Sequence, residues 1–252
     1  MADKPLHQHS IEIHQNRLSW DRKPVLQSTY RRFYQEISEA LRSQDGKGVL
    51  ELGSGIGAIK TVLPECITSD IFPNPWLDRT ENAYKINLAD NSLNGLILFD
   101  VWHHLEFPGT ALKEFARVVR PGGRVVLFEP AMGLLGRAIY GLFHHEPLGL
   151  KEPISWAPID DKAPELRYYA AQGNCWRSFY KAEYDIKSMA YFRVAEVRTY
   201  SALCYIASGG FSKPQLYPSF ARPMLEGIEH LLDRHPALFA TRMLVCLERS
   251  SV

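Results

Sequence analysis

The sequence predicts an α/β protein in which a doubly wound, mostly parallel sheet has helices on both faces. Apolar runs at residues 49–52, 66–71, 93–101 and 124–128 have the length of buried strands. A glycine-rich turn, Gly53 to Gly57, follows the first run, and a helical pattern separates the last two. Strands that alternate with helices favour a parallel sheet covered on both faces.

The elements of the first half follow from start and stop signals. Ser28 is a suitable N-cap for a helix over residues 28–43, whose apolar side is formed by Phe33, Ile37, Ala40 and Leu41. Pro64 limits the helix after the glycine turn, and the proline-rich residues 72–79 exclude one before a very short third strand at residues 84–86. A further helix begins near Pro108, with apolar residues at Leu112, Phe115, Ala116 and Val119.

The second half has weaker signals. A helix is expected over residues 132–143, with its core face formed by Leu135, Ala138, Ile139 and Leu142. Residues 146–180 are rich in Pro and aromatic residues without periodicity, which indicates an irregular cap. Strands are predicted at residues 194–207 and 239–248. Between them an amphipathic helix starts at Ser219 and ends before Pro236, with one stripe formed by Met224, Leu225, Ile228, Leu231 and Leu232.

The chain is interpreted as a single domain of 252 residues with four parts. Residues 1–27 are polar and aperiodic, and are expected to be a disordered arm or a flap that closes over a site. Residues 28–130 form the core that carries the glycine turn. Residues 131–192 and 206–237 are expected to be insertions that form a cap.

Composition restricts the class of protein. A formal net charge of +1 with interspersed acids and bases argues against a nucleic-acid substrate. The four cysteines are scattered without a CxxC pair, which favours reduced thiols in a cytoplasmic protein. No signal peptide or membrane span is predicted, and nothing indicates the oligomeric state.

Four motifs resemble those of the class I S-adenosylmethionine-dependent methyltransferases, with their Rossmann-like fold. They are Glu51-Leu-Gly-Ser-Gly-Ile-Gly57, Asp70 at the end of the second strand, Phe99-Asp-Val-Trp-His-His-Leu105 and Leu112-Lys-Glu-Phe-Ala-Arg-Val-Val-Arg-Pro-Gly-Gly-Arg124. Their order and spacing match the family over residues 47–130, about a third of the chain. The resemblance implies a terminal antiparallel hairpin formed by the two late strands.

The resemblance also implies a cofactor, S-adenosylmethionine, with S-adenosylhomocysteine as its product. Glu51 would face the amino group of the cofactor, and Asp70 would accept hydrogen bonds from the ribose hydroxyls. The remaining contacts would come from the backbone of Gly53, Ser54 and Gly55 at the amino-acid end, from Asn82 at the adenine amine, from Ile71 and Ala83 around the ring, and from Phe99 and Asp100 beside the sulfonium.

Structural roles compete with these functional ones. Asp70 and Asp100 are also suited to capping a loop, and Glu51 to pairing with a buried cation. His103 and His104 are candidates for a general base, although a packing role is favoured and adjacent residues are expected to point in different directions. No metal site is predicted, because His144 and His145 lack a third ligand at metal spacing. The cap aromatics are expected in the core or around an apolar substrate.

The function predicted first is methyl transfer to an oxygen or nitrogen of a small-molecule acceptor. One alternative is a catalytically silent protein of the same fold that binds the cofactor or a partner. Another is a nicotinamide oxidoreductase, because Gly53, Gly55 and Ala58 nearly fit the dinucleotide fingerprint. The Glu51 position and the Pro121-Gly122-Gly123 turn argue against this second alternative.

Overall fold

The computed structural model describes residues 3–159 and 168–251, with side chains from residue 11 onward in the first helix. A seven-stranded sheet has the order β3-β2-β1-β4-β5-β7-β6. The strands are β1 (Val49–Leu52), β2 (Ile67–Asp70), β3 (Arg79–Thr80), β4 (Leu93–Phe99), β5 (Val119–Pro130), β6 (Phe192–Tyr200) and β7 (Arg242–Arg249). The first five in sequence pair in parallel, and β7 runs antiparallel to β5 and β6. This confirms the predicted sheet and its antiparallel C-terminal pair.

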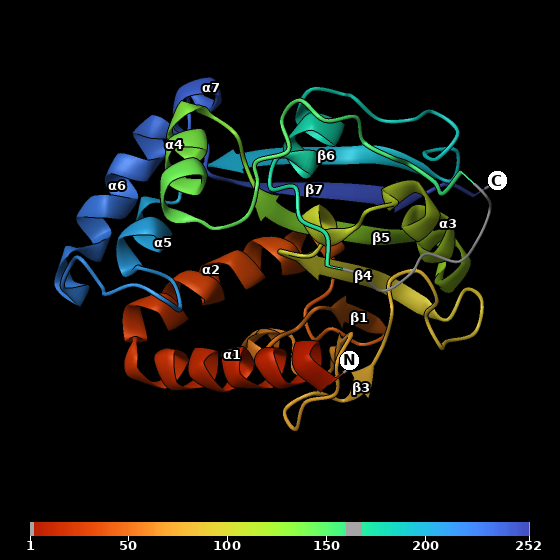
Figure 1. Ribbon diagram of the computed structural model, residues 1–252, viewed down its shortest axis with the longest axis horizontal. Helices are drawn as coiled ribbons and strands as arrows, with labels where there is room; N and C mark the ends of the chain where they lie inside the picture. The colour runs from red at the N-terminus through yellow and green to blue at the C-terminus, as the bar shows by residue number, and fades with distance from the viewer. Residues whose placement is uncertain (1–2, 160–167, 252) are drawn as a thin grey trace.

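The helices lie on both faces and at one end of this sheet. They are α1 (Asp3–Arg22), α2 (Pro24–Leu41), α3 (Pro108–Val118), α4 (Leu134–Phe143), α5 (Leu203–Ser208), α6 (Arg222–Leu232) and α7 (Pro236–Phe239). Short turns are η1 (Ala58–Thr61), η2 (Trp102–His104), η3 (Trp176–Tyr180) and η4 (Ser219–Ala221). Helices α4 to α7 gather beyond the end of β5 in Figure 1.

Alternation along β4 shows how the sheet separates two apolar layers. Leu96 and Leu98 face the layer that contains α3, whereas Ile97 and Phe99 face the layer that contains α2. Successive strand residues point to opposite faces, so a strand that is apolar throughout must be covered on both. The carboxyl ends of the parallel strands are left to form a site.

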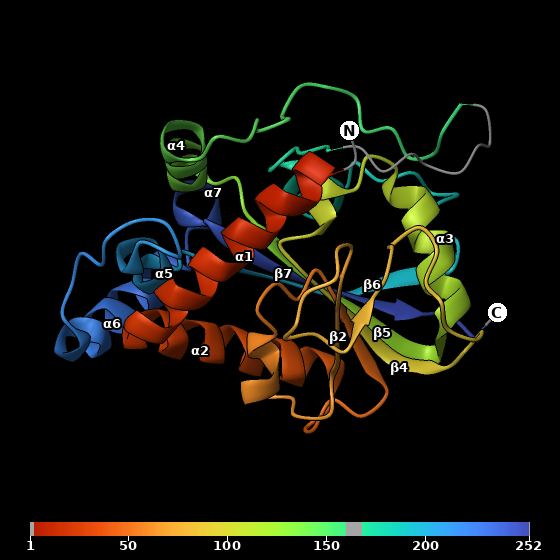
Figure 2. The ribbon, with the colours of Figure 1, turned by 60° about the horizontal axis from the view of Figure 1, so that its bottom comes forward.

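The N-terminal arm differs from the expectation. Residues 3–22 form the helix α1, and α2 begins at Pro24 instead of Ser28. The Ser28 hydroxyl donates to the carbonyl of Val25 within α2, so it is not a cap. Figures 1 and 2 show α1 and α2 meeting in a V. Tertiary burial explains α1, because Ile13 and Trp20 are buried in the layer that contains α2.

Two strand predictions need correction. The third strand lies at Arg79–Thr80 beside β2, and residues 82 and 85 form only an isolated bridge. The strand predicted at residues 194–207 ends at Tyr200. Ala202 has a φ of +48°, which breaks the extended backbone and starts α5.

The predicted core faces of two helices are wrong. On α4, Leu142 is 76% exposed and Ala138 is exposed, while Gly136 and Tyr140 are buried. On α6, Met224 and Leu231 are 64% and 60% exposed, and the buried residue is Glu229. Both helices therefore pack through a face other than their most apolar stripe.

The described part of the predicted cap is mostly irregular, as expected. Residues 146–159 and 168–173 contain no regular helix or strand. Residues 174 and 175 begin a helical turn that continues into η3. Trp176 and Phe179 are buried in the core layer of α3, whereas Tyr168 is exposed. Residues 160–167 of the cap lie outside the described residues. Within the described ranges, no helix is both long and apolar enough to cross a bilayer.

Candidate functional site

The glycine turn after β1 is shaped by left-handed backbone conformations. Gly53 has a φ of +68°, and a Cβ there would lie 2.3 Å from the Val101 side chain. Gly55 has a φ of +55°, with Ile13 of α1 as the near neighbour of the position that a Cβ would take. Both positions therefore favour glycine, and the turn can bring its backbone against a ligand.

Serine hydrogen bonds hold this turn against β2. The Ser54 amide donates to the carbonyl of Ser69 at 2.8 Å, and the Ser69 amide donates to Ser54 Oγ at 3.1 Å. Asn74, in the proline-rich loop, donates from Nδ2 to the Gly55 carbonyl at 2.7 Å. The sequence did not single out Asn74, although an Asn between two prolines is a recognisable turn signal.

Asp70 lies at the carboxyl end of β2 and is largely buried. Its Oδ2 accepts from the Gly55 amide at 3.3 Å, and its Oδ1 accepts from the Ile71 amide at 2.7 Å. The carboxylate thus lies beside the glycine turn, as the sequence predicts for a ribose-binding acid.

Glu51 is a buried carboxyl group on β1, and only 1% of its surface is exposed. Its Oε2 has no hydrogen-bond partner among the described residues. Burial, and secondarily the charge of Asp70, raises the pKa of Glu51 to about 8. An unsatisfied carboxyl beside the turn is suited to a cationic ligand group, because a cation restores the interaction that burial removed.

The predicted adenine residues lie near this site. The Glu81 amide donates to the Asp70 carbonyl at 3.0 Å, which brings residues 81–83 beside residues 70–71. Ile71 is exposed and Ala83 is half-buried. Asn82 Oδ1 accepts from the Tyr84 amide at 2.9 Å, so one of its lone pairs stabilises a turn. The adenine roles of these residues stay predictions.

Phe99 and Asp100 follow at the carboxyl end of β4. The Phe99 ring is buried and stacks on Tyr30, with ring centroids 5.2 Å apart. Asp100 has a φ of +56°, and its Oδ1 lies 2.7 Å from Nη1 of Arg242. The Phe99 side chain therefore belongs to the core, and only backbone at this point can border a ligand.

Arg242 is a functional candidate that the sequence reasoning missed. It is fully buried at the start of β7, and its guanidinium lies 5.2, 5.0 and 5.5 Å from the rings of Phe99, Phe128 and Tyr205. Nε of Arg242 has no partner among the described residues. The sequence feature that could have identified Arg242 is a cation directly before an apolar run, Met243 to Leu247. A charge that is buried with such a run must be paired.

His103 and Glu129 form a second buried pair beside the first site. His103 Nδ1 lies 2.6 Å from Glu129 Oε2, and Glu129 Oε1 accepts from the Val101 and Trp102 amides, both at 2.7 Å. Burial disfavours a charged imidazole, but the Glu129 carboxylate outweighs it and raises the pKa of His103 to about 10. His103 therefore has an ionic partner beyond the packing role favoured from the sequence.

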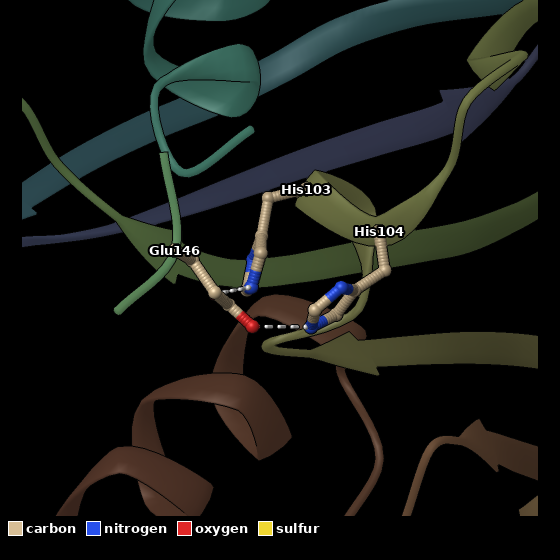
Figure 3. A group of neighbouring side chains, drawn as sticks. All are labelled: His103, His104 and Glu146. Atoms are coloured by element: carbon tan, nitrogen blue, oxygen red, sulfur yellow. Dashed lines mark ion pairs between the residues drawn. The ribbon is translucent and has the colours of Figure 1, made fainter. Parts of the chain in front are cut away.

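Both histidines also approach Glu146, from the loop after α4. His103 Nε2 and His104 Nε2 lie 3.6 and 3.7 Å from the two Glu146 oxygens, and Figure 3 shows both rings turned toward that carboxylate. The expectation that these two adjacent side chains point in different directions is wrong. The reason is that residues 102–104 form the helical turn η2, in which neighbouring side chains do not alternate as in a strand. Glu146 was missed because it is 42 residues from His104.

Comparison with known proteins supports the assignment of the first half of the chain. Residues 50–127 match the family described as "Methyltransferase domain". An uncharacterized methyltransferase of Mycobacterium tuberculosis is 32% identical over 93 residues, which cover 31% of this chain and 38% of the relative. An O-methyltransferase of Aspergillus nomiae is 27% identical over 132 residues, which cover 43% and 59%. The chain thus matches less than two thirds of the length of these relatives.

Solved structures share the fold. A geranyl diphosphate methyltransferase in complex with S-adenosylmethionine has a TM-score of 0.51 at 11% identity, over 87% of this chain and 85% of that one. The cyclase SpnF has a TM-score of 0.50 at 13% identity, over 87% and 81%. At these identities the similarity shows the fold alone, and a fold can host more than one reaction. The residues matched at the sequence level, however, include most of β1, the glycine turn, Asp70 and β4, so this part of the chain is similar to the methyltransferase domain family in sequence as well as in fold.

Proposed function

We propose that this protein transfers the methyl group of S-adenosylmethionine to an oxygen or nitrogen of a small molecule. The observation that carries the proposal is the unsatisfied, buried Oε2 of Glu51 beside a glycine turn that also holds Asp70. An ammonium group and a pair of ribose hydroxyls match these two carboxyl groups in charge and hydrogen bonding. The nicotinamide alternative leaves the buried Glu51 without a cationic partner.

Each part of the turn has a role in this proposal. The cofactor supplies an activated methyl group. The backbone of Gly53, Ser54 and Gly55 lies against its amino-acid end, and Glu51 holds the amino group. Asp70 accepts from the ribose, and Ile13 of α1 covers the turn and limits water access. The chain thus binds and orients the reactants in a dry site.

The acceptor side lies around Asp100, at the carboxyl end of β4. The Arg242 ion pair fixes Asp100, and the buried rings of Tyr30 and Phe99 pack behind it in the core. A small molecule would therefore meet the backbone at this point and not these rings. The likeness to an O-methyltransferase supports an oxygen acceptor, and the net charge of +1 argues against nucleic acid.

Calorimetry with S-adenosylhomocysteine tests the cofactor site. We expect the wild-type protein to bind it, and Asp70→Ala to lose about 2–4 kcal/mol of binding free energy because two charge-assisted hydrogen bonds disappear. Asp70→Asn keeps the shape of the side chain but removes its charge, so comparison with Asp70→Ala shows how much of the loss in binding is due to the charge. The exposed Asp21 on α1 provides a control, and Asp21→Ala should bind like the wild type.

Two outcomes would overturn the proposal. A folded wild-type protein that does not bind S-adenosylhomocysteine refutes cofactor use, and tighter binding of NADH favours the oxidoreductase alternative. Mass spectrometry of an acceptor screen with S-adenosylmethionine then tests transfer. Methylation confined to macromolecules would refute the small-molecule acceptor.

A further inference from the structure

Three side chains outside the proposed cofactor contacts converge on one point. They are His103 and His104 from η2 and Glu146 from the loop after α4 (Figure 3). Their ligand-forming atoms lie within 4.8 Å of one another. His103 Nε2 lies 3.6 Å from Glu146 Oε2, and His104 Nε2 lies 3.7 Å from Glu146 Oε1, so each ring faces its own oxygen of the carboxylate.

The hydrogen bonds of His104 make the arrangement informative. Its Nδ1 lies 2.9 Å from the carbonyl oxygen of Tyr169, which can only accept, so Nδ1 carries the proton. In a neutral ring Nε2 then has a lone pair, which faces Glu146 Oε1 at 3.7 Å. Two acceptors that face each other repel, and a metal ion bound between them would remove this repulsion.

His103 is oriented by a carboxylate. Its Nδ1 faces Glu129 Oε2 at 2.6 Å, and its Nε2 faces Glu146. Histidines that bind metal ions commonly donate the other ring N–H to a carboxylate or a backbone carbonyl, which fixes the ring and its tautomer. Glu129 and the Tyr169 carbonyl supply one acceptor of each kind.

Glu146 is itself supported. Tyr168 donates its hydroxyl to Oε1 at 2.7 Å, and the Gln172 amide donates to Oε2. The side-chain oxygen of Gln172, Oε1, is buried without a hydrogen-bond partner in the described part of the chain. That oxygen can accept from a water bound to an ion, which adds a second unsatisfied group to the cluster.

We propose that His103 Nε2, His104 Nε2 and the Glu146 carboxylate bind one divalent transition-metal ion of the zinc or iron(II) class. Two imidazoles and one carboxylate fit these metals, whereas magnesium and calcium prefer oxygen ligands. Three protein ligands leave at least one position open for water or an oxygen of a small molecule. The proposal does not depend on methyl transfer.

Metal titration of the full chain tests this site. Protein freed of metal with a chelator is titrated with Co²⁺, which gives visible absorption bands when bound by nitrogen and oxygen ligands, and then with Zn²⁺. We expect one Co²⁺ to bind and one Zn²⁺ to displace it, with release of protons because the ligands must be deprotonated. His104→Ala and Glu146→Gln should each weaken Zn²⁺ binding by about 100-fold or more.

The chain offers a matched control. His145 is exposed and stacks on His144, and it is not one of the three residues that converge. His145→Ala should bind Zn²⁺ like the wild type. The absence of Co²⁺ bands in folded wild-type protein would overturn the proposal and indicate that a proton occupies the cluster. Equal Zn²⁺ affinity in folded His104→Ala and wild type would also overturn it. Loss of S-adenosylhomocysteine binding without loss of Co²⁺ binding would refute the proposed function alone.

Discussion

Glu51 shows how a single buried carboxyl group can make stability depend on pH. Its carboxyl group is buried on β1 with an oxygen that no described residue satisfies, and its pKa is raised to about 8. The folded protein therefore holds a proton that the unfolded chain releases near pH 4.5. Unfolding then becomes easier as the pH rises between these two values, by up to about 1.4 kcal/mol per pH unit.

Glu51→Gln removes this titration while keeping the shape of the side chain. We expect the variant to match the wild type below pH 4.5 and to become progressively more stable than the wild type toward pH 8. It should bind S-adenosylhomocysteine at least about tenfold more weakly, because a neutral amide replaces a charged partner. Thermal unfolding from pH 4.5 to 8.5, together with calorimetry, measures both effects.

The exposed Glu65 supplies the control, and Glu65→Gln should change neither property. A stability difference between Glu51→Gln and wild type that does not vary with pH would contradict the raised pKa. Unchanged binding would show that Glu51 does not hold the amino group.

Helix α1 is an element whose place in the structure is decided by two residues. Trp20 is buried and packs edge-on against Tyr30 at 5.7 Å and on Phe211 at 6.4 Å, while Ile13 lies beside Gly55. Ser19 adds a hydrogen bond to the Phe211 carbonyl at 2.7 Å. The helix is thus attached at one end to the aromatic cluster and covers the glycine turn at the other.

Trp20→Ala should detach α1. We expect a loss of about 3 kcal/mol in the free energy of unfolding, because a large buried ring is removed. Protease cleavage within residues 3–22 should become faster, and S-adenosylhomocysteine should bind more weakly. Denaturant unfolding and limited proteolysis measure these changes. Leu18, exposed on the same helix, gives the control, and a Leu18→Ala variant as unstable as Trp20→Ala would contradict this account.

Helix α6 packs through a polar residue. The buried Glu229 lies 2.7 Å from Arg32 of α2, and it accepts from the Cys204 amide at 2.7 Å. Met224 and Leu231 are exposed on other sides of the helix. The ion pair therefore helps to connect α6 to the domain, together with the half-buried Leu225 of the apolar stripe.

Glu229→Gln should destabilise the protein by about 2 kcal/mol, because Arg32 loses its charged partner. Met224→Lys should change the unfolding free energy by less than about 0.5 kcal/mol, because the site is exposed. Denaturant unfolding of both variants measures these two changes in the free energy of unfolding. The opposite ranking would show that the apolar stripe is buried in solution.

At the scale of the molecule, the two carboxyl-rich sites share one end of the sheet. Glu51, Asp70 and Asp100 follow or end parallel strands, and the Glu129 side chain contacts the residues after β4. Carboxyl ends of parallel strands meet at one edge, where strand order reverses beside β1. The family match ends at residue 127, so Glu129 and Arg242 lie outside it.

The sequence alone was sufficient to predict the parallel strands and the glycine turn in the first half of the molecule. The sheet and the turn were predicted from local signals, namely short apolar runs, the glycine turn and Asp70. Such signals can be recognised in a sequence because they depend only on residues that are close together in the chain. The exact start of α2 and the place of β3 were wrong, since element ends depend on competing local bonds such as that of Ser28.

Only the tertiary structure decided the rest. Helix α1 forms although its sequence is polar, because Ile13 and Trp20 find partners far along the chain. Met224, Ile228 and Leu231 of α6 are exposed. An amphipathic pattern predicts which face of a helix is apolar, but it does not predict which neighbour covers that face. Glu146 meets His103 and His104, and Arg242 meets Asp100, across separations of 42 or more residues, a distance over which sequence spacing carries no geometric information.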